Sequence, residues 1–170
     1  MFTRDPLANP DALIRRVYSY CAYRLGDGPE AEDATSDTFE RALRYRSSYD
    51  RKKGPPAAWL IGIARRCVDD VASSRLQTVD EPIEEAAPER DAALRIDLAR
   101  AVTALDERDR ELVALRYGAD LTARQIGELL GLRTNAVEVA LHRALARLRH
   151  ELGSDGRAVE PRTLQPEPAR

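Results

Sequence analysis

The feature that most constrains the fold is the segment from Thr122 to Arg149, where cap and turn residues separate two runs of helical periodicity. Thr122 and Gln125 have the spacing of a capping box, which starts a helix by satisfying its free backbone N–H groups. Gly131 follows this short helix, and glycine adopts the left-handed conformation that ends a helix at little cost. Thr134 is expected to cap a second helix. A short capped helix, a glycine turn and a longer helix are together typical of a helix-turn-helix.

The second of these helices carries an apolar stripe, which is expected to face the protein interior. The stripe consists of Val137, Leu141, Leu145 and Leu148. The residues left to enter the major groove of DNA are Arg133, Thr134, Asn135, Glu138, His142 and Arg143. Arginine prefers guanine, asparagine prefers adenine, and glutamate can accept a hydrogen bond from cytosine. The alternative is that these side chains form the solvent face of an ordinary helical hairpin.

The rest of the chain favours an all-α fold, because helix formers dominate and strand-favouring residues are few. Residues 76–89 are acidic, contain prolines, lack helical periodicity and are expected to form a linker. We therefore predict two small helical domains joined by an acidic linker, with a three-helix bundle at 8–75 and a helix-turn-helix domain at 90–152. Residues 153–170, rich in proline and poor in large apolar residues, are predicted to be a disordered tail.

The N-terminal bundle is predicted from three helical patterns. The first contains Leu13 and Leu25 and stops at the breaker that precedes Pro29. The second runs from about Pro29 to about Arg46, with Tyr45 on its apolar side, and the third from about 57 to 73. A bundle of this size buries only about 60% of its unfolded surface, so partner surfaces can matter to it.

Composition excludes several classes of function. No apolar run is long enough to span a bilayer and the N-terminus lacks the apolar core of a signal peptide, so a cytoplasmic protein without direct membrane insertion is expected. Cys21 and Cys67 lie in apolar helical patterns and are expected to be structural. No metal cluster, cofactor motif or nucleophile–base pair stands out, so an enzyme is not expected. The net charge of −2 does not exclude DNA binding, which depends on local cationic contacts.

Four segments follow one another along the chain: AEDATSDTFERALR (31–44), WLIGIARRCVDD (59–70), LDERDRELVALRYGADLTARQIGELLGL (105–132) and HRALARLR (142–149). In this order they resemble the extracytoplasmic-function sigma factors of bacterial RNA polymerase. The resemblance implies a dissociable polymerase subunit that recognises two promoter elements and initiates transcription. Its N-terminal domain would be sigma region 2 and its C-terminal domain sigma region 4. It also implies an inhibitory anti-sigma partner.

The same resemblance implies roles for individual residues. Those that would bind core polymerase are Glu32, Asp33, Asp37 and Phe39. Those that would bind the minus-ten element are Tyr49, Arg51, Lys52, Lys53, Trp59, Arg65 and Arg66. Cations beside aromatic residues suit a surface that follows phosphates and stacks bases. Trp59 also fits a core position. The helix-turn-helix would contact the minus-thirty-five element.

The sequence departs from the family where Glu138-Val139-Ala140 replaces the usual Lys-Ser-Arg run, which removes two cations. Two other functions stay open, and this departure bears on the second of them. One is a helix-turn-helix regulator that binds duplex DNA alone, usually as a dimer. The other is a sigma-like interaction module that no longer contacts DNA.

Overall fold

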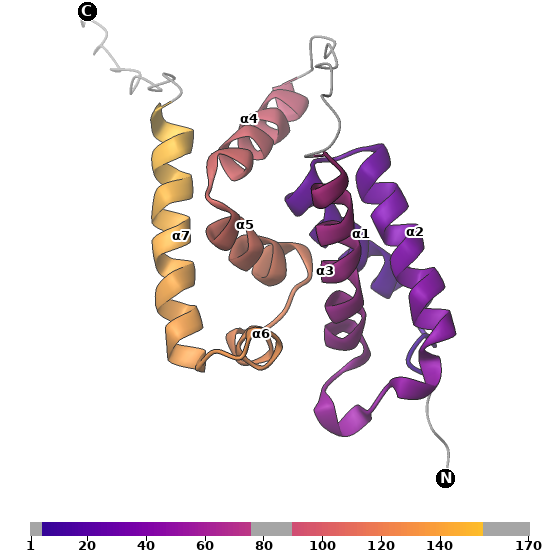
Figure 1. Ribbon diagram of the computed structural model, residues 1–170. Coiled ribbons are helices and arrows are strands. Elements are labelled where there is room, and N and C mark those ends of the chain that lie inside the picture. The colour runs from indigo at the N-terminus through magenta and orange to yellow at the C-terminus, as the bar shows by residue number, and fades with distance from the viewer. Residues whose placement is uncertain (1–4, 76–89, 155–170) are drawn as a thin grey trace, which may run out of the picture.

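The computed structural model describes residues 5–75 and 90–154, apart from the side chains of 90–94 and 154, and the described chain is all-α (Figure 1). The N-terminal unit consists of α1 (Pro10–Leu25), α2 (Pro29–Arg44), the short turns η1 (Arg46–Ser48) and η2 (Arg51–Lys53), and α3 (Pro56–Arg75). The C-terminal unit consists of α4 (Arg90–Ala104), α5 (Glu107–Val113), the π-helical turn η3 (Ala114–Gly118), α6 (Ala123–Leu130) and α7 (Thr134–Ser154). The predicted linker, 76–89, and nearly all of the predicted tail lie outside the described residues.

The three predicted N-terminal helices are confirmed, with small differences at their ends. Pro29 stands in the first turn of α2, where its missing N–H costs no hydrogen bond. The placement of Tyr45 on the buried side of α2 was wrong, because its side chain is 54% exposed. Helix α2 ends at Arg44, so Tyr45 no longer follows the helical repeat that buries Ala42 one turn earlier.

The helix-turn-helix forms as predicted at α6 and α7. The Thr122 hydroxyl accepts from the Gln125 N–H at 3.2 Å, and the Gln125 side chain accepts from the Thr122 N–H at 2.9 Å. Gly131 has φ 69° and ψ 30°, the left-handed conformation expected for a helix end. The cap predicted at Thr134 was wrong by one residue. The Arg133 carbonyl accepts from the Val137 N–H at 3.1 Å, so Thr134 is already inside the first turn.

The apolar stripe of α7 faces inward, as predicted. Val137, Leu141 and Leu148 are buried and Leu145 is half-buried. The C-terminal half of the stripe packs on residues of α4 and α5. The cluster there contains Ala101, Val102, Leu105, Val113, Ala144 and Leu148. Arg147 of α7 forms an ion pair with the buried Asp109 of α5, which ties the two helices together.

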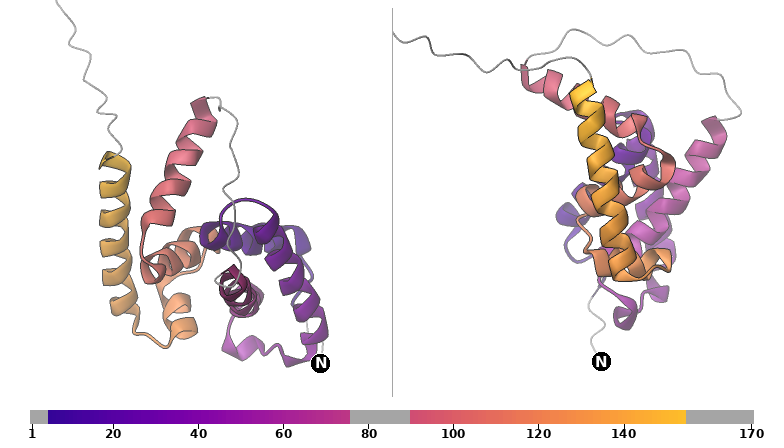
Figure 2. Two further views of the ribbon diagram at one scale, coloured as in Figure 1. Left: turned by 45° about the horizontal axis from the view of Figure 1, so that its top comes forward. Right: turned by 90° about the vertical axis from the view of Figure 1, so that its left-hand side faces the viewer.

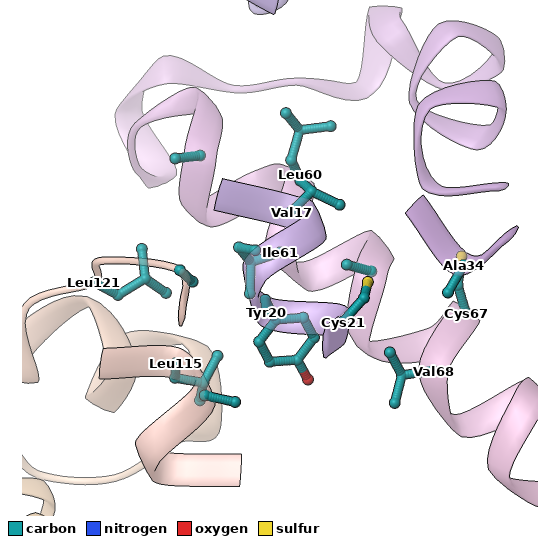
Figure 3. Packing of buried hydrophobic residues seen from close by; sticks show 14 of the residues in the cluster. Val17, Tyr20, Cys21, Ala34, Leu60, Ile61, Cys67, Val68, Leu115 and Leu121 are labelled. Atoms are coloured by element: carbon teal, nitrogen blue, oxygen red, sulfur yellow. The ribbon is translucent and has the colours of Figure 1, made fainter. Parts of the chain in front are cut away.

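The two units are joined by a common hydrophobic core, which the sequence analysis did not predict. One cluster of buried side chains includes Val17 and Tyr20 of α1, Ile61 of α3, and Leu115 and Leu121 of the C-terminal unit. Figure 3 shows Leu115 and Leu121 beside Tyr20 and Ile61. In Figures 1 and 2, α5 and the turn after it lie between α7 and α1. In the described chain, the two helical units therefore pack directly against each other.

Gly118 makes this close approach of α1 and η3 possible. A Cβ atom at this position would lie 3.0 Å from the Tyr20 Cα and 3.1 Å from the Ser19 carbonyl oxygen. Both contacts are to helix backbone, which cannot rotate away as a flexible side chain can. A side chain at position 118 would therefore push the two units apart.

Candidate nucleic-acid interface

Every residue predicted to face DNA from the recognition helix α7 and its start is exposed. These residues are Arg133, Thr134, Asn135, Glu138, His142 and Arg143. None is packed into the buried stripe on the opposite side of α7, where Val137 is 0% exposed. The helix therefore presents cationic, amide and carboxylate groups to solvent along its first three turns, and these groups match base edges in the major groove.

A second glycine, Gly127, determines the geometry of the turn between α6 and α7. A Cβ at Gly127 would lie 2.6 Å from the Leu132 carbonyl oxygen, a distance that side chains do not tolerate. The Leu132 N–H donates to the Gly127 carbonyl at 2.8 Å, which closes the turn. Position 127 thus admits only glycine if Arg133 and Asn135 are to hold their places relative to α6.

The loop predicted to bind the minus-ten element lies beside an aromatic pair. Tyr49 and Trp59 pack with ring centroids 5.5 Å apart and planes tilted by 58°. The Tyr49 hydroxyl donates to the Gly54 carbonyl at 3.1 Å, and the Asp50 carboxylate accepts from the Lys52 N–H at 2.9 Å. These bonds hold the basic turn against the start of α3.

The predicted minus-ten residues differ in their surroundings. Arg51, Lys52, Lys53 and Arg66 are exposed. Trp59 is half-buried: it packs against the core and also lines an open groove of about 480 Å³. The packing agrees in part with the expected core position, and the stacking of bases on Trp59 stays a prediction.

Arg65 differs from these exposed cations because its side chain is partly buried. Its guanidinium is directed to the other unit, where Nε donates to the Glu111 Oε1 of α5 at 2.7 Å. The Arg65 side chain is 32% exposed, whereas the Glu111 side chain is 12% exposed. The guanidinium of Arg65 is therefore paired with a carboxylate of the C-terminal unit.

The groove beside Trp59 has walls from both units. Lys53, Gly62 and Arg66 line it from the N-terminal unit, and Gln125 and Glu128 line it from α6. A Cβ at Gly62 would meet the Leu129 side chain at 3.6 Å, an ordinary contact distance. The first helix of the helix-turn-helix therefore covers one side of the predicted minus-ten surface.

The acidic residues predicted to bind polymerase lie on the outer side of α2. Glu32, Asp33 and Asp37 are exposed, while Phe39 is half-buried and packs against the core. The three carboxylates thus form an accessible acidic face.

Sequence reasoning missed a charged network between the units. The Tyr20 hydroxyl donates to both Glu111 oxygens, at 3.1 and 3.2 Å, and Arg24 forms an ion pair with the same carboxylate. Arg24 also donates to Glu107 at 2.9 Å. Burial raises the pKa of Tyr20 to about 12. No sequence pattern marks this network, because its members, with Arg65 of α3 included, come from three helices far apart in the chain.

The two cysteines are buried and free of any disulfide, in agreement with a structural role. Burial raises the pKa of the Cys21 thiol to about 11 and raises that of Cys67 as well. Both thiols are thereby unreactive at neutral pH. Within 5–75 and 90–154, no three His, Cys, Asp or Glu side chains are grouped so that they could hold a metal ion. In the same ranges, none of the helices is both long and apolar enough to cross a membrane.

Comparison with known families gives two matches, one in each unit. Residues 11–75 match sigma-70 region 2, and residues 95–148 match sigma-70 region 4. The first match covers the three N-terminal helices, and the second covers most of α4 to α7.

Curated relatives are similar across most of the chain. ECF RNA polymerase sigma factor BldN of Streptomyces coelicolor is 33% identical over 158 residues, which cover 86% of this chain and 60% of BldN. ECF RNA polymerase sigma factor SigK of Mycobacterium sp. (strain KMS) is 30% identical, with 84% of this chain and 80% of SigK covered. For ECF RNA polymerase sigma factor ShbA of Streptomyces griseus the identity is 32%, and the coverages are 86% and 85%.

Two solved structures share the fold. The sigma factor RpoE, crystallised with the anti-sigma factor NepR from Bartonella quintana, has a TM-score of 0.69 at 18% identity, over 84% of this chain and 93% of RpoE. CnrH in complex with the cytosolic domain of CnrY has a TM-score of 0.60 at 25% identity, over 86% of this chain and 83% of CnrH.

Proposed function

The chain belongs to the extracytoplasmic-function family of RNA polymerase sigma factors, and we propose that it binds core polymerase and directs it to specific promoters. It acts inside the cell and catalyses no reaction of its own. Polymerase performs the chemistry, and this chain supplies promoter selectivity and holds the opened strand.

The observation that carries the proposal is the orientation of α7. Its apolar stripe faces the interior, and the six predicted DNA-facing residues, from Arg133 before the helix to Arg143 in its third turn, are all exposed. In helix-turn-helix proteins the N-terminal residues of the second helix contact base edges. On this basis α7 contacts the minus-thirty-five element through Arg133, Asn135 and Glu138.

The N-terminal unit supports the other two roles. The exposed cations Arg51, Lys52 and Lys53, next to the Tyr49–Trp59 pair, provide phosphate contacts and stacking surfaces for a minus-ten strand. The acidic face of α2 provides a docking surface for core polymerase.

The solved structures with a similar fold suggest what kind of protein regulates this chain. Both solved relatives are complexes with a second protein, the anti-sigma factor NepR in one and the cytosolic domain of CnrY in the other. We extend the first case to this chain and propose an anti-sigma factor as its regulator.

A reconstituted transcription assay tests the proposal. The purified full chain is added to core polymerase with genomic DNA fragments, and new transcripts are sequenced from their 5′ ends. We expect transcripts from a defined promoter set only when both are present. Asp33→Lys combined with Asp37→Lys is expected to reduce polymerase binding, and Asn135→Ala to reduce promoter selection without reducing polymerase binding.

Two results would contradict the proposal and favour one of the other functions. Protection of duplex DNA by the free chain, with no effect of polymerase, would indicate a stand-alone regulator. Tight binding to polymerase without promoter-specific transcripts would indicate an interaction module.

A further inference from the structure

The side of α7 that faces away from the protein contains an apolar residue that the sequence analysis did not assign to DNA binding. Val139 is 51% exposed, and neither hydrophobic cluster of the described chain includes it. Single exposed apolar side chains are common on protein surfaces. What sets Val139 apart is its position on the recognition helix.

Val139 lies directly opposite the buried side of α7. Helices α4, α5 and α6 all pack on one side of α7 (Figure 1), where its buried residues lie, namely Val137, Leu141, Ala144 and Leu148. Successive residues of an α-helix are rotated by about 100°. By this repeat Val139 is roughly 170° and Asn135 roughly 150° from the middle of the four buried residues, whereas Glu138 is roughly 90° from it. Val139 and Asn135 therefore point most directly toward a duplex that α7 contacts.

We propose that Val139 is a specificity-determining residue, which packs against the C5-methyl group of a thymine in the minus-thirty-five element. The inference rests on the proposed function, because it concerns the bases that α7 contacts. Thymine is the base that carries a methyl group in the major groove, and apolar side chains recognise it by contact. The valine side chain matches this group and can form no hydrogen bond to any base.

Asn135 and Val139 are one turn apart, which fixes the spacing of the bases that they reach. Residues i and i+4 of a helix have Cβ atoms about 5–6 Å apart, and base pairs are stacked at about 3.4 Å. The two side chains therefore reach base pairs one or two steps apart. Asparagine prefers adenine, so the proposed target contains an adenine and a thymine within two steps of each other.

The charges of α7 leave base contacts as the main source of selectivity around Val139. Residues 134–142 contain no lysine or arginine. This part of α7 therefore exerts little attraction on phosphates, whose contacts carry no sequence information. Ala136, about one turn before Val139 and also exposed, is small enough to let the helix approach the base edges closely. A side chain as short as valine needs such a close approach.

Replacing thymidine by deoxyuridine tests the contact, because deoxyuridine pairs with adenine but lacks the C5-methyl group. The holoenzyme is assembled from core polymerase and the full chain, and the probes are duplexes from the promoters that the transcription assay identifies. Each thymidine of the minus-thirty-five element is replaced in turn, on either strand, and affinity is measured by competition. At one thymidine we expect wild-type affinity to fall about fourfold, which corresponds to about 0.8 kcal/mol for one buried methyl group.

Three variants assign this loss to a residue. Val139→Ser removes both methyl groups of the side chain, so the duplexes with thymidine and with deoxyuridine should bind equally. Val139→Ile keeps an apolar contact and should keep the loss. Leu152→Ser makes a similar exchange at an apolar position near the end of α7 that is 42% exposed, and it should also keep the loss. Thermal unfolding checks that each variant is folded, as expected for exposed positions.

The inference is overturned if the deoxyuridine loss is as large in Val139→Ser as in the wild type, because another residue then contacts the methyl group. It is also overturned if base-pair changes in the element reduce affinity but no deoxyuridine does, and the proposed function survives that result. If no base-pair change in the element reduces affinity, or if the assay identifies no promoter, the proposed function fails together with the inference.

Discussion

Arg65 and Glu111 are 46 positions apart in the chain, yet the Arg65 Nε donates to the Glu111 Oε1 at 2.7 Å. This bond joins α3 of the N-terminal unit to α5 of the C-terminal unit. It connects a residue predicted to contact promoter DNA with a carboxylate for which the sequence suggested no role. The contact therefore joins a residue of the proposed DNA-binding surface to the C-terminal unit.

Asn135→Ala is expected to weaken binding to the minus-thirty-five duplex. Asparagine pairs with adenine through two hydrogen bonds, so the variant should lose about 1–3 kcal/mol of discrimination at one base position. Fluorescence anisotropy with a set of duplexes, each changed at one base pair, measures the loss. Ala146→Ser, on an exposed part of α7 outside the DNA-facing set, is the control. An equal loss at every base position would contradict a base-specific role.

Glu138→Lys is expected to strengthen duplex binding and to make it more dependent on salt. The exchange restores a cation in the run where family members have them. One additional phosphate contact steepens the slope of log K against log salt by about one. Asp33→Lys on α2 makes the same charge change away from α7 and serves as the control in this assay, which contains no polymerase. Identical slopes for the two variants would show that only the net charge matters.

Trp59→Ala is expected to reduce affinity for single-stranded DNA by about 1–3 kcal/mol, the typical contribution of one stacked base. Because Trp59 also packs against the core, some loss of stability is expected and is measured by thermal unfolding. Tyr117→Ala removes a ring that is 50% exposed and lies outside the groove, so its affinity should not change. A loss of stability without any loss of affinity would assign Trp59 to the core alone.

Gly127→Ala is expected to disrupt the helix-turn-helix. The new Cβ would lie 2.6 Å from the Leu132 carbonyl oxygen, so the turn must shift and α7 must move relative to α6. Duplex binding should fall more than tenfold, and the free energy of unfolding should fall by about 1–3 kcal/mol. Gly153→Ala, in open space near the end of α7, is expected to leave both unchanged or slightly raise stability. Equal behaviour of the two variants would contradict the close contact.

Tyr20 is expected to make stability depend on pH in the alkaline range. Burial raises its pKa to about 12, from an unfolded value of about 10, so the folded state favours the neutral phenol. This contribution is fully present below about pH 10 and is lost as the pH rises towards 12. Two pKa units correspond to about 2.7 kcal/mol.

Urea unfolding of the wild type and Tyr20→Phe at pH 8, 9.5 and 11 measures this effect. We expect the difference in unfolding free energy between the two proteins to shrink or reverse as the pH rises. Cys21, whose pKa is raised to about 11, is present in both proteins and largely cancels. If the difference in unfolding free energy does not change with pH, the pKa of Tyr20 is not raised in the folded protein, and the prediction is wrong.

Much of the local structure was predictable, because it depends on residues close together in sequence. The Thr122–Gln125 capping box, the left-handed Gly131 and the buried stripe that begins at Val137 follow from helix periodicity and capping chemistry. Tyr45 and Thr134 were misplaced because helix ends depend on which backbone groups find partners, and apolar spacing does not reveal that. The individual DNA and polymerase contacts remain predictions.

By itself, the sequence determined which segments are helical, where the helix-turn-helix lies and which face of α7 stays polar. Only the tertiary structure decided that the two units share a core, that Gly118 packs on the backbone of α1, and that Arg65 pairs with Glu111. The physical reason is the range of the interactions. Capping and periodicity act within a few residues, whereas a buried ion pair depends on helices brought together by packing over the whole chain.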